Sequence, residues 1–326
     1  MKVLVLGGAG YIGSHAVLAL REKGFEPVVL DDLSRGHRAA VIGAGLIEAD
    51  LTAVDLAAVL KESECGAVMH FAALSQVGES VSRPDLYYRN NVAGGLLLLD
   101  AMVKSGVRYL IFSSSAAVYG EPSRVPISED HPTAPVNPYG ATKLAFEGAM
   151  RWYAHAFGLR YASLRYFNAA GAHPDGLLGE DHRPETHLIP LVLKAVLGDC
   201  PMAVFGNDYP TYDGTCIRDY IHVCDLASAH LLALQALLAG EPSSVFNLGT
   251  GRGYSVLQMI ETARRVTDHD ISIQLSPRRP GDPAELVAGS RLAGERLGWR
   301  PRYPELEDIV THAWRWHRAH PEGYPA

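Results

Sequence analysis

The chain has 326 residues, 29 of them basic and 36 acidic, and a net charge of −7 at pH 7. This length exceeds what one hydrophobic core usually serves, so one large domain with an added lobe, or two domains, is expected. No run of Lys or Arg is long enough to follow a phosphate backbone, which argues against nucleic acid as a partner. The N-terminal apolar run is too short for a secretory signal or a membrane span, so we expect a soluble, cytoplasmic protein with no membrane partner.

The first half of the chain alternates apolar, strand-like runs with helical patterns. Strands are predicted at 2–7, 27–31, 46–50, 67–72 and 108–115, with a sixth at 160–167. Helices are predicted at about 11–23, 52–62, 84–104 and 138–157. This alternation is typical of a Rossmann-type, doubly wound α/β fold, in which helices wrap a parallel sheet.

After Asn168 the sequence becomes rich in Gly, Pro and His, before a helix begins near Leu188. The second half has fewer clean alternations and closes with the helical stretch "IVTHAWRWHRAH" (309–320). This change predicts a second, smaller α/β lobe. The expected division is 1–168 with about 220–250 for the first domain, and about 169–219 with 251–326 for the second lobe.

A glycine pattern, Gly7-x-x-Gly10-x-x-Gly13, falls between the first strand and the first helix. It fits either a tight strand–helix turn or a backbone that approaches a pyrophosphate at a helix N-terminus. Asp31 ends the second predicted strand, where a carboxylate can accept hydrogen bonds from an adenosine ribose and disfavours the 2′-phosphate of NADP. Arg35 argues for NADP, but NAD is the favoured cofactor. Asp50, at the end of the third strand, is expected near the adenine amine.

Tyr139 and Lys143 stand four residues apart in "NPYGATK" (137–143). If this stretch opens a helix, the two side chains lie one turn apart on one face. A neighbouring cation favours the phenolate, but lowering the pKa of a tyrosine from about 10 to about 7 needs roughly 4 kcal/mol. Lysine alone cannot supply this, so a bound oxidised cofactor has to contribute. The plain alternative is an amphipathic helix with a packed Tyr and a solvated Lys.

Ser115 lies in "SSSAAVYG" (113–120), at the end of the fifth predicted strand, where open sheets present their ligands. Its hydroxyl could bind a substrate hydroxyl, or it could simply cap a turn. The glycine turn, this serine and the Tyr–Lys pair are far more specific together than apart.

These three motifs resemble those of the extended short-chain dehydrogenase/reductase superfamily. Along nearly its whole length the chain is similar to the UDP-glucose 4-epimerases of the NAD-dependent epimerase/dehydratase family. The similar stretches are "GGAGYIGSH" (7–15), "DDLSRG" (31–36), "HFAALSQVGES" (70–80), "RNNVAG" (89–94), "SSSAAVYG", "NPYGATK", "LRYFNAAGA" (164–172), "FGNDYPTYDGTCIRDYIHV" (205–223) and "NLGTGRGYSV" (247–256).

The resemblance implies a redox-neutral reaction on UDP-galactose and UDP-glucose. Tyr139 takes the proton of the sugar 4-hydroxyl, the C4 hydride passes to NAD, and the 4-keto sugar turns over before hydride returns to its other face. Ser115 shares the proton at the 4-oxygen, and Lys143 contacts Tyr139 and the nicotinamide ribose. The first domain then binds NAD, and the smaller lobe binds the UDP-sugar.

The resemblance also implies two sets of binding residues. The NAD set is Gly7, Gly10, Tyr11, Ile12, Gly13, Asp31, Asp32, Leu33, Ser34, Arg35, Gly36, Asp50, Leu51, Phe71, Ala72, Ala73, Leu74, Ser75, Asn90, Ser115, Tyr139, Lys143 and Phe167. The UDP-sugar set is Ser115, Tyr139, Asn168, His187, Leu188, Ala203, Phe205, Arg218, Arg279 and Asp282. The forked donors of arginines suit a diphosphate. Plainer readings are a core aromatic for Phe205, an ion pair with Asp219 for Arg218 and a solvated cation for Arg279.

Three positions depart from the family pattern: Ser75 stands where lysine is common, Ala117 where threonine often assists the serine, and His187 where asparagine is familiar. The missing lysine implies weaker retention of NAD. Leu286 stands at the family's gate for the sugar, and its intermediate size leaves N-acetylated sugars open. Pentose and uronate sugars are further alternatives.

No metal is expected. His173, His182 and His187 are spaced as in no helical pair or zinc motif. The four cysteines have no Cys-x-x-Cys spacing and are expected to be buried small residues: Cys65, Cys200, Cys216 and Cys224.

Two other functions share part of this pattern of residues. A nucleotide-sugar 4,6-dehydratase shares the Tyr–Lys pair but needs an acid pair after the strand-end residue, where this chain has Ala116 and Ala117. A protein that binds NAD or a nucleotide-sugar without turnover would not need the intact set of Ser115, Tyr139 and Lys143. The resemblance further implies a homodimer in which helices near 84–104 and 138–157 pair across a two-fold axis.

Overall fold

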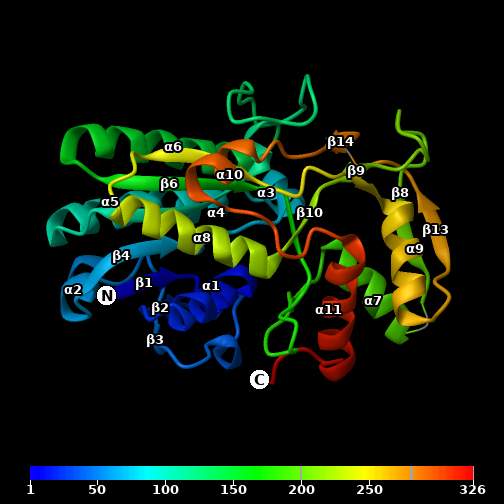
Figure 1. Cartoon of the computed structure of the whole chain (residues 1–326), viewed down its shortest axis with the longest axis horizontal. Coiled ribbons are helices and arrows are strands. Elements are labelled where there is room, and N and C mark those ends of the chain that lie inside the picture. The colour runs from blue at the N-terminus through cyan, green and yellow to red at the C-terminus, as the bar shows by residue number, and fades with distance from the viewer. Residues whose placement is uncertain (199, 280–281, 326) are drawn as a thin grey trace.

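The computed structural model describes residues 1–198, 200–279 and 282–325. Its centre is a seven-stranded parallel sheet with strand order β11-β6-β5-β4-β1-β2-β3 (Figure 1). The strands are β1 (Lys2–Leu6), β2 (Glu26–Asp31), β3 (Gly45–Glu48), β4 (Cys65–His70), β5 (Tyr109–Ser115), β6 (Arg160–Tyr166) and β11 (Ser244–Leu248). The Rossmann-type fold predicted from the sequence is confirmed.

Helices cover both faces of this sheet, and each face has its own core. Successive residues of a strand point to opposite faces, so Val5 joins one core with Val17 and Leu234, while Leu4 joins the other with Leu98. The first face carries α1 (Tyr11–Glu22), α8 (Val223–Leu238) and α10 (Arg291–Leu297), and the second carries α2 (Leu56–Glu62), α5 (Gly94–Ser105) and α6 (Pro138–Phe157). Within the described ranges, no helix combines the length and apolar character that crossing a membrane requires.

The strand order reverses between β1 and β4. The chain proceeds from β1 outward to β2 and β3, and from β4 outward to β5 and β6 on the other side. Ligands of open α/β sheets bind at such a switch point, beyond the carboxyl ends of the strands. The loops after β1, β4 and β5 therefore meet at one edge of the sheet, and they carry the glycine turn, Phe71 and Ser115.

The single helix predicted over 84–104 is wrong in detail. The structure has α3 (Val77–Ser82), α4 (Pro84–Tyr87), a π-helical turn η2 (Tyr88–Ala93) and then α5. π-Turns are frequent at functional sites. Here the turn carries Asn91, whose buried side chain accepts a hydrogen bond from the Leu74 N–H at 2.9 Å and donates to the Leu74 carbonyl at 3.0 Å. The turn thus fixes the loop after β4.

The remaining elements form a second lobe, which we define as α7, α9, α11 and the short strands around them, at the right of Figure 1. They pack around a core that includes Val192, Met259 and Ile309. Their bounds are β7 (Asn168–Ala170), α7 (Leu188–Gly198), β8 (Met202–Phe205), β9 (Ile217–Arg218), β10 (Tyr220–His222), β12 (Tyr254–Ser255), α9 (Val256–Thr267), β13 (Ile273–Ser276), β14 (Glu285–Leu286) and α11 (Leu306–Ala319). Outside this lobe, η1 (Arg38–Ala40) and η3 (Ala116–Val118) are 3-10 turns.

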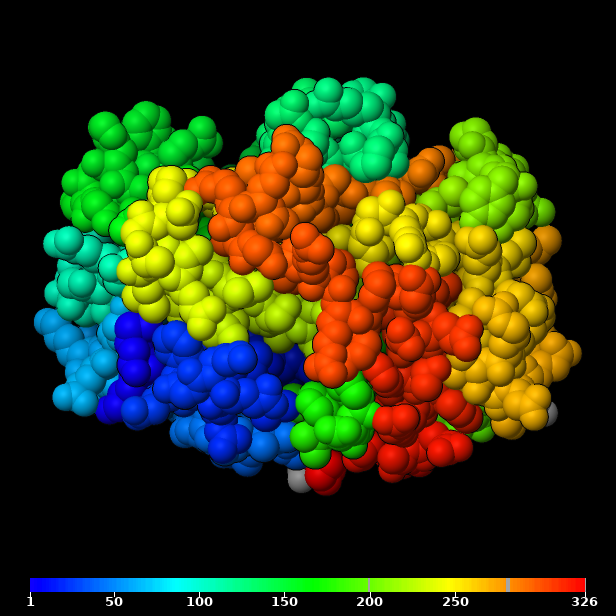
Figure 2. Space-filling view, viewed as in Figure 1, coloured from blue at the N-terminus to red at the C-terminus, as the bar shows by residue number. Residues whose placement is uncertain are grey.

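The segment between β7 and α7 lies against the C-terminal residues. The Tyr324 N–H donates to Asp181 Oδ2 at 3.0 Å, and the Gly179 N–H donates to the Tyr324 hydroxyl at 2.9 Å. Figure 2 shows this green segment beside the red C-terminal residues at the lower edge of the molecule. The segment also contacts α1, because the Tyr11 hydroxyl donates to the Gly171 carbonyl at 2.7 Å.

Candidate active site

A cavity of about 330 Å³ opens at the switch point of the sheet. Most of the residues predicted from the sequence line it together: Gly7, Gly10, Tyr11, Ile12, Gly13, Asp31, Asp32, Ser34, Arg35, Gly36, Asp50, Leu51, Phe71, Ala72, Ala73, Leu74, Ser75, Asn90, Ser115, Tyr139, Lys143, Phe167, Asn168, His187 and Leu188. Outside its lining are Leu33, Ala203, Phe205, Arg218, Arg279 and Asp282. Lining residues that the sequence analysis did not name include Gln76, Glu79, Tyr166, Glu180, Thr186 and Tyr220, and His182 was considered there only as a metal ligand.

The glycine turn after β1 serves both packing and binding. Gly7 has φ +76°, and a Cβ there would lie 2.5 Å from the Ala72 nitrogen, while a Cβ on Gly13 would lie 2.1 Å from the Gly7 oxygen. These two glycines are required by the tight turn itself. Gly10 differs, because a Cβ there would meet only the Gly7 oxygen at 3.4 Å. Gly10 is the N-cap of the twelve-residue helix α1 and faces the cavity, so the turn fits a pyrophosphate.

Asp31 is positioned by the backbone of the same turn. One carboxylate oxygen accepts from the Ala9 N–H and the other from the Leu33 N–H, both at 2.9 Å. Burial raises the pKa of this carboxyl above its ordinary value, and the two hydrogen bonds oppose that effect. Its remaining lone pairs can accept from ribose hydroxyls at the cavity wall.

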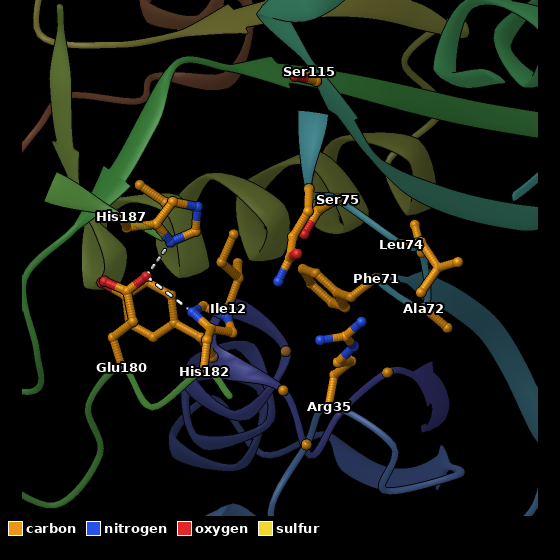
Figure 3. Close-up of a pocket in the computed structure, with 18 of the residues that line it drawn as sticks. Ile12, Arg35, Phe71, Ala72, Leu74, Ser75, Ser115, Glu180, His182 and His187 are labelled. Atoms are coloured by element: carbon orange, nitrogen blue, oxygen red, sulfur yellow. Dashed lines mark hydrogen bonds and ion pairs between the residues drawn. The ribbon is translucent and has the colours of Figure 1, made fainter. Parts of the chain in front are cut away.

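Arg35 is engaged by other parts of the protein. Its guanidinium lies 3.3 Å from Glu79 Oε1 and donates to the Arg183 carbonyl at 3.1 Å. Figure 3 shows Arg35 at the edge of the cavity, below Phe71. Because Glu79 balances its charge, Arg35 is a poor partner for a 2′-phosphate, and Asp31 stands close by in the chain. The residues present therefore fit NAD better than NADP.

Asp50 lies beyond the third strand rather than at its end, because β3 ends at Glu48. Its carboxylate accepts from the Thr52 N–H at 2.7 Å and from the Thr52 hydroxyl at 2.8 Å. It still lines the cavity, next to Leu51. The turn, rather than the strand, thus presents this carboxylate.

Helix α6 begins where the sequence predicted. Pro138 occupies its first turn, and the Asn137 side chain caps it by accepting from the Gly140 N–H at 2.9 Å. Tyr139 and Lys143 consequently lie one turn apart, and both are buried, with 7% and 3% of their surface exposed. The Lys143 Nζ lies 5.7 Å from the centre of the Tyr139 ring and donates to the Ser113 carbonyl at 2.7 Å.

Tyr139 and Ser115 both line the cavity, so the end of β5 and the start of α6 meet there. Burial raises the pKa of Tyr139 above its ordinary value, and the Ser115 hydroxyl opposes this rise. Burial also lowers the pKa of Lys143 to about 7, against a raising effect of Glu147. Without a bound cofactor the pKa of Tyr139 is therefore not lowered, because desolvation dominates both groups.

A buried ion pair between Glu147 and Arg165 links α6 to β6 next to the Tyr139–Lys143 pair. Glu147 on α6 accepts from Arg165 Nε at 3.0 Å, from Ser114 at 2.7 Å and from Ser163 at 2.8 Å. Arg165 also donates to the Tyr119 hydroxyl at 2.9 Å. The pair was not predicted, because its partners come from α6, β5 and β6. It fixes α6 against the strand that carries Ser115.

Asp219 ties together the segments that pass between the two lobes. Its carbonyl accepts from the Asn168 N–H at 3.0 Å, and its carboxylate accepts from the N–H groups of Thr250 at 2.8 Å and Ala288 at 3.1 Å. The considered ion pair with Arg218 is wrong. Neighbouring residues along a strand point to opposite sides, and Arg218 instead pairs with Asp282.

Four residues predicted at the substrate lie together in the second lobe. The buried Arg218 side chain faces Asp282, and the guanidinium of Arg279 stacks over the Phe205 ring at 4.1 Å from its centre. Arg279 is thus not simply a solvated cation. Phe205 is half-buried and belongs to β8, as does Ala203. The group presents two guanidinium ions within one lobe, apart from the lining of the main cavity.

A match to a family model places this cavity in a known class. Residues 3–249 match the model described as the NAD dependent epimerase/dehydratase family, and the chain belongs to that family. It is 52% identical, over 326 residues, to the UDP-glucose 4-epimerase of Halalkalibacterium halodurans, covering 99% of this chain and 98% of the relative.

Solved structures agree with this assignment. A UDP-glucose 4-epimerase crystal structure is 51% identical, with a TM-score of 0.97 over 100% of both chains. A UDP-glucose-4-epimerase from Stenotrophomonas maltophila, solved with bound NAD and formylated UDP-arabinopyranose, is 42% identical, with a TM-score of 0.94 over 99% of both chains.

Proposed function

We propose that this protein is a UDP-glucose 4-epimerase, which interconverts UDP-galactose and UDP-glucose through a 4-keto sugar and uses NAD. The observation that carries the proposal is the convergence of Tyr139, Ser115 and Lys143 in the cavity that begins at the glycine turn, with Tyr139 and Lys143 one helical turn apart. The family membership and the full-length relatives named UDP-glucose 4-epimerase support it.

Each catalytic side chain has a distinct task. Tyr139 removes the proton of the sugar 4-hydroxyl as a phenolate, and Ser115, which lines the same cavity, shares that proton at the 4-oxygen. When bound, NAD supplies the hydride-accepting and hydride-returning chemistry at C4. Lys143 donates to the Ser113 carbonyl and lies beside Tyr139. When the Lys143 amine is protonated, its charge stabilises the Tyr139 phenolate. The buried Glu147–Arg165 pair keeps these groups in register.

The sugar has to turn over within the cavity, so the substrate is anchored at its nucleotide end. We propose Arg218 and Arg279 as ligands of the diphosphate, since guanidinium groups bind such oxygens bidentately. Arg218 would exchange its contact with Asp282 for phosphate oxygens. In this proposal the part of the chain around the large sheet binds NAD, and the second lobe binds UDP.

A dimer is part of the proposal. Helices α5 and α6 pack side by side and expose large apolar side chains, including Leu97 at 47%, Trp152 at 70% and Phe157 at 56%. A second copy of the chain, related by a two-fold axis, would cover them. The four cysteines are free thiols, which suits the reducing cytoplasm as the working compartment.

The alternatives make different products. A 4,6-dehydratase would need an acid after Ser115, where η3 presents Ala116 and Ala117. A pentose substrate deserves a parallel assay, because the Stenotrophomonas maltophila structure holds a UDP-pentose derivative.

The decisive experiment incubates the purified protein with UDP-galactose without added reductant. We expect UDP-glucose as product, and turnover about 10²–10⁴-fold lower in Tyr139→Phe with NAD still bound. A product that has lost water would point to the dehydratase, and an unchanged rate in the variant would remove Tyr139 as the base.

A further inference from the structure

Three residues of the cavity lining lie with Glu185 in a group of side chains that can bind a metal: Glu180, His182 and His187. Glu180, His182, Glu185 and His187 each offer one oxygen or nitrogen atom, and these four atoms all lie within 4.8 Å of one another. We call them the Glu/His cluster. Figure 3 shows Glu180 between the two histidine rings, all three facing one another. Four residues of one eight-residue segment, 180–187, thus converge on one point.

The distances within the cluster suit a tetrahedral ion. Zinc binds histidine nitrogen and carboxylate oxygen at about 2.0–2.2 Å, so neighbouring ligand atoms of a tetrahedron lie about 3.3–3.6 Å apart. His182 Nδ1 lies 3.3 Å from Glu180 Oε1 and 3.7 Å from Glu185 Oε1. His187 Nδ1 lies 3.9 Å from Glu185 Oε1 and directly against Glu180. Small side-chain shifts would complete the tetrahedron.

Burial and charge also favour a cation. The side chains of Glu180 and Glu185 are each only 3% exposed, and among the described residues their ion-pair partners are the two histidines alone. Two buried carboxylates need a compensating charge. His182 Nδ1 is buried and makes no hydrogen bond of acceptable geometry within the described parts of the chain, although it faces Glu180. A buried imidazole nitrogen without a hydrogen-bond partner is available to bind a metal in its neutral form.

Backbone N–H groups fix the position of Glu185 in the cluster. Glu185 Oε1 accepts from the N–H groups of Thr186 at 2.8 Å and His187 at 2.9 Å, just before α7 begins. The His182 ring lies edge-on to the Tyr11 ring, 6.2 Å between centres, at the start of α1. The cluster therefore sits where the segment between β7 and α7 meets the helix that follows the glycine turn.

We propose that Glu180, His182, Glu185 and His187 bind one Zn²⁺ ion, which fastens residues 180–187 over the cavity. Two imidazoles select zinc over magnesium and calcium, which prefer oxygen ligands only. Four protein ligands leave no open position, so the ion is structural and takes no part in the reaction. His187 uses Nδ1 for the metal, and its Nε2 remains free for the substrate contact predicted from the sequence. The proposal is independent of the identity of the sugar.

The first test measures zinc binding by untagged protein that has been treated with a chelator. Titration calorimetry is expected to give one Zn²⁺ per chain. At a free zinc concentration 100-fold above Kd, the apparent unfolding constant should fall about 100-fold, which appears as a higher Tm. Binding of Co²⁺ should give the strong visible absorption of a tetrahedral site, displaced by Zn²⁺. A wild-type protein without saturable binding, or with the same Tm in zinc and in chelator, would overturn the proposal.

Variants separate this site from adventitious binding. His182→Gln and Glu185→Gln should each lose the stoichiometric ion and the zinc-dependent rise in Tm. His269→Gln, which removes an exposed histidine after α9, should keep both. Retention of one tightly bound ion in both cluster variants would refute the assignment. The Co²⁺ spectrum of the wild-type protein decides the question even if a variant fails to fold. None of these readouts depends on epimerase activity.

Discussion

Replacing Lys143 by methionine should stabilise the cofactor-free protein while abolishing its activity. Burial lowers the pKa of this amine from 10.5 to about 7, so the folded state at pH 7 disfavours the charged group by roughly 4 kcal/mol relative to the unfolded chain. Methionine has a similar length and removes this cost. It also leaves the Ser113 carbonyl without its donor, which costs about 1–3 kcal/mol. The expected net gain at pH 7 is therefore about 1–3 kcal/mol.

The gain should depend on pH in a defined direction. Because the folded-state pKa lies below the unfolded one, the unfolded wild-type chain binds the extra proton between pH 7 and 10.5. Wild-type stability should therefore rise with pH across this window, and Lys143→Met should lack that component. The advantage of the variant is largest below pH 7 and disappears towards pH 10.

Urea unfolding of NAD-free protein, followed by tryptophan fluorescence at several pH values, measures this effect. Lys61→Met on the exposed side of α2 is the matched control and should change stability by less than about 0.5 kcal/mol. A Lys143→Met protein that is less stable than wild type at pH 6–7, or a difference that does not change with pH, would refute the reasoning. Turnover by the same variant should fall steeply, since Tyr139 loses its cationic neighbour.

Three further outcomes are expected. Extensive dialysis should leave less than one NAD per chain, because Ser75 replaces the common lysine, and Ser75→Lys should retain more; stoichiometric NAD in the dialysed wild type would contradict this. Leu286→Tyr should lower turnover of UDP-N-acetylglucosamine more than that of UDP-glucose in parallel assays, and equal losses would exclude a gate. Trp152→Glu should shift the protein from dimer to monomer in light scattering, whereas Leu275→Glu, at an exposed apolar residue of β13, should not; a dimeric Trp152→Glu would exclude this face.

Local sequence patterns predicted most of the fold and most of the residues that line the cavity. Strand-like runs, the glycine turn and the capped start of α6 are local patterns, and the structure has the predicted elements in their places. The π-turn at Tyr88–Ala93 was missed because its register depends on Asn91 reaching the loop after β4. A contact between residues this far apart leaves no periodic pattern in the sequence.

Partners that come from distant elements were the main omission. Glu147 on α6 meets Arg165 on β6, and Glu180 meets His182 and His187 because the segment folds back on itself. Spacing rules for metal motifs assume a regular helix or hairpin, so they did not detect this group. The wrong partner considered for Arg218 has a simpler origin, since sequence neighbours in a strand do not share a side of it.

The hydrogen bonds of Asp219 have a mechanical consequence. The polypeptide passes between the two lobes near Asn168, Asp219, Thr250 and Ala288, and Asp219 bonds to each of the other three residues. Crossings that share one residue permit the lobes to bend but resist their sliding and separation. Cleavage of the exposed loop around Asp175 by a protease should therefore leave the two fragments associated. The two lobes of the cleaved protein should still be unable to move far apart.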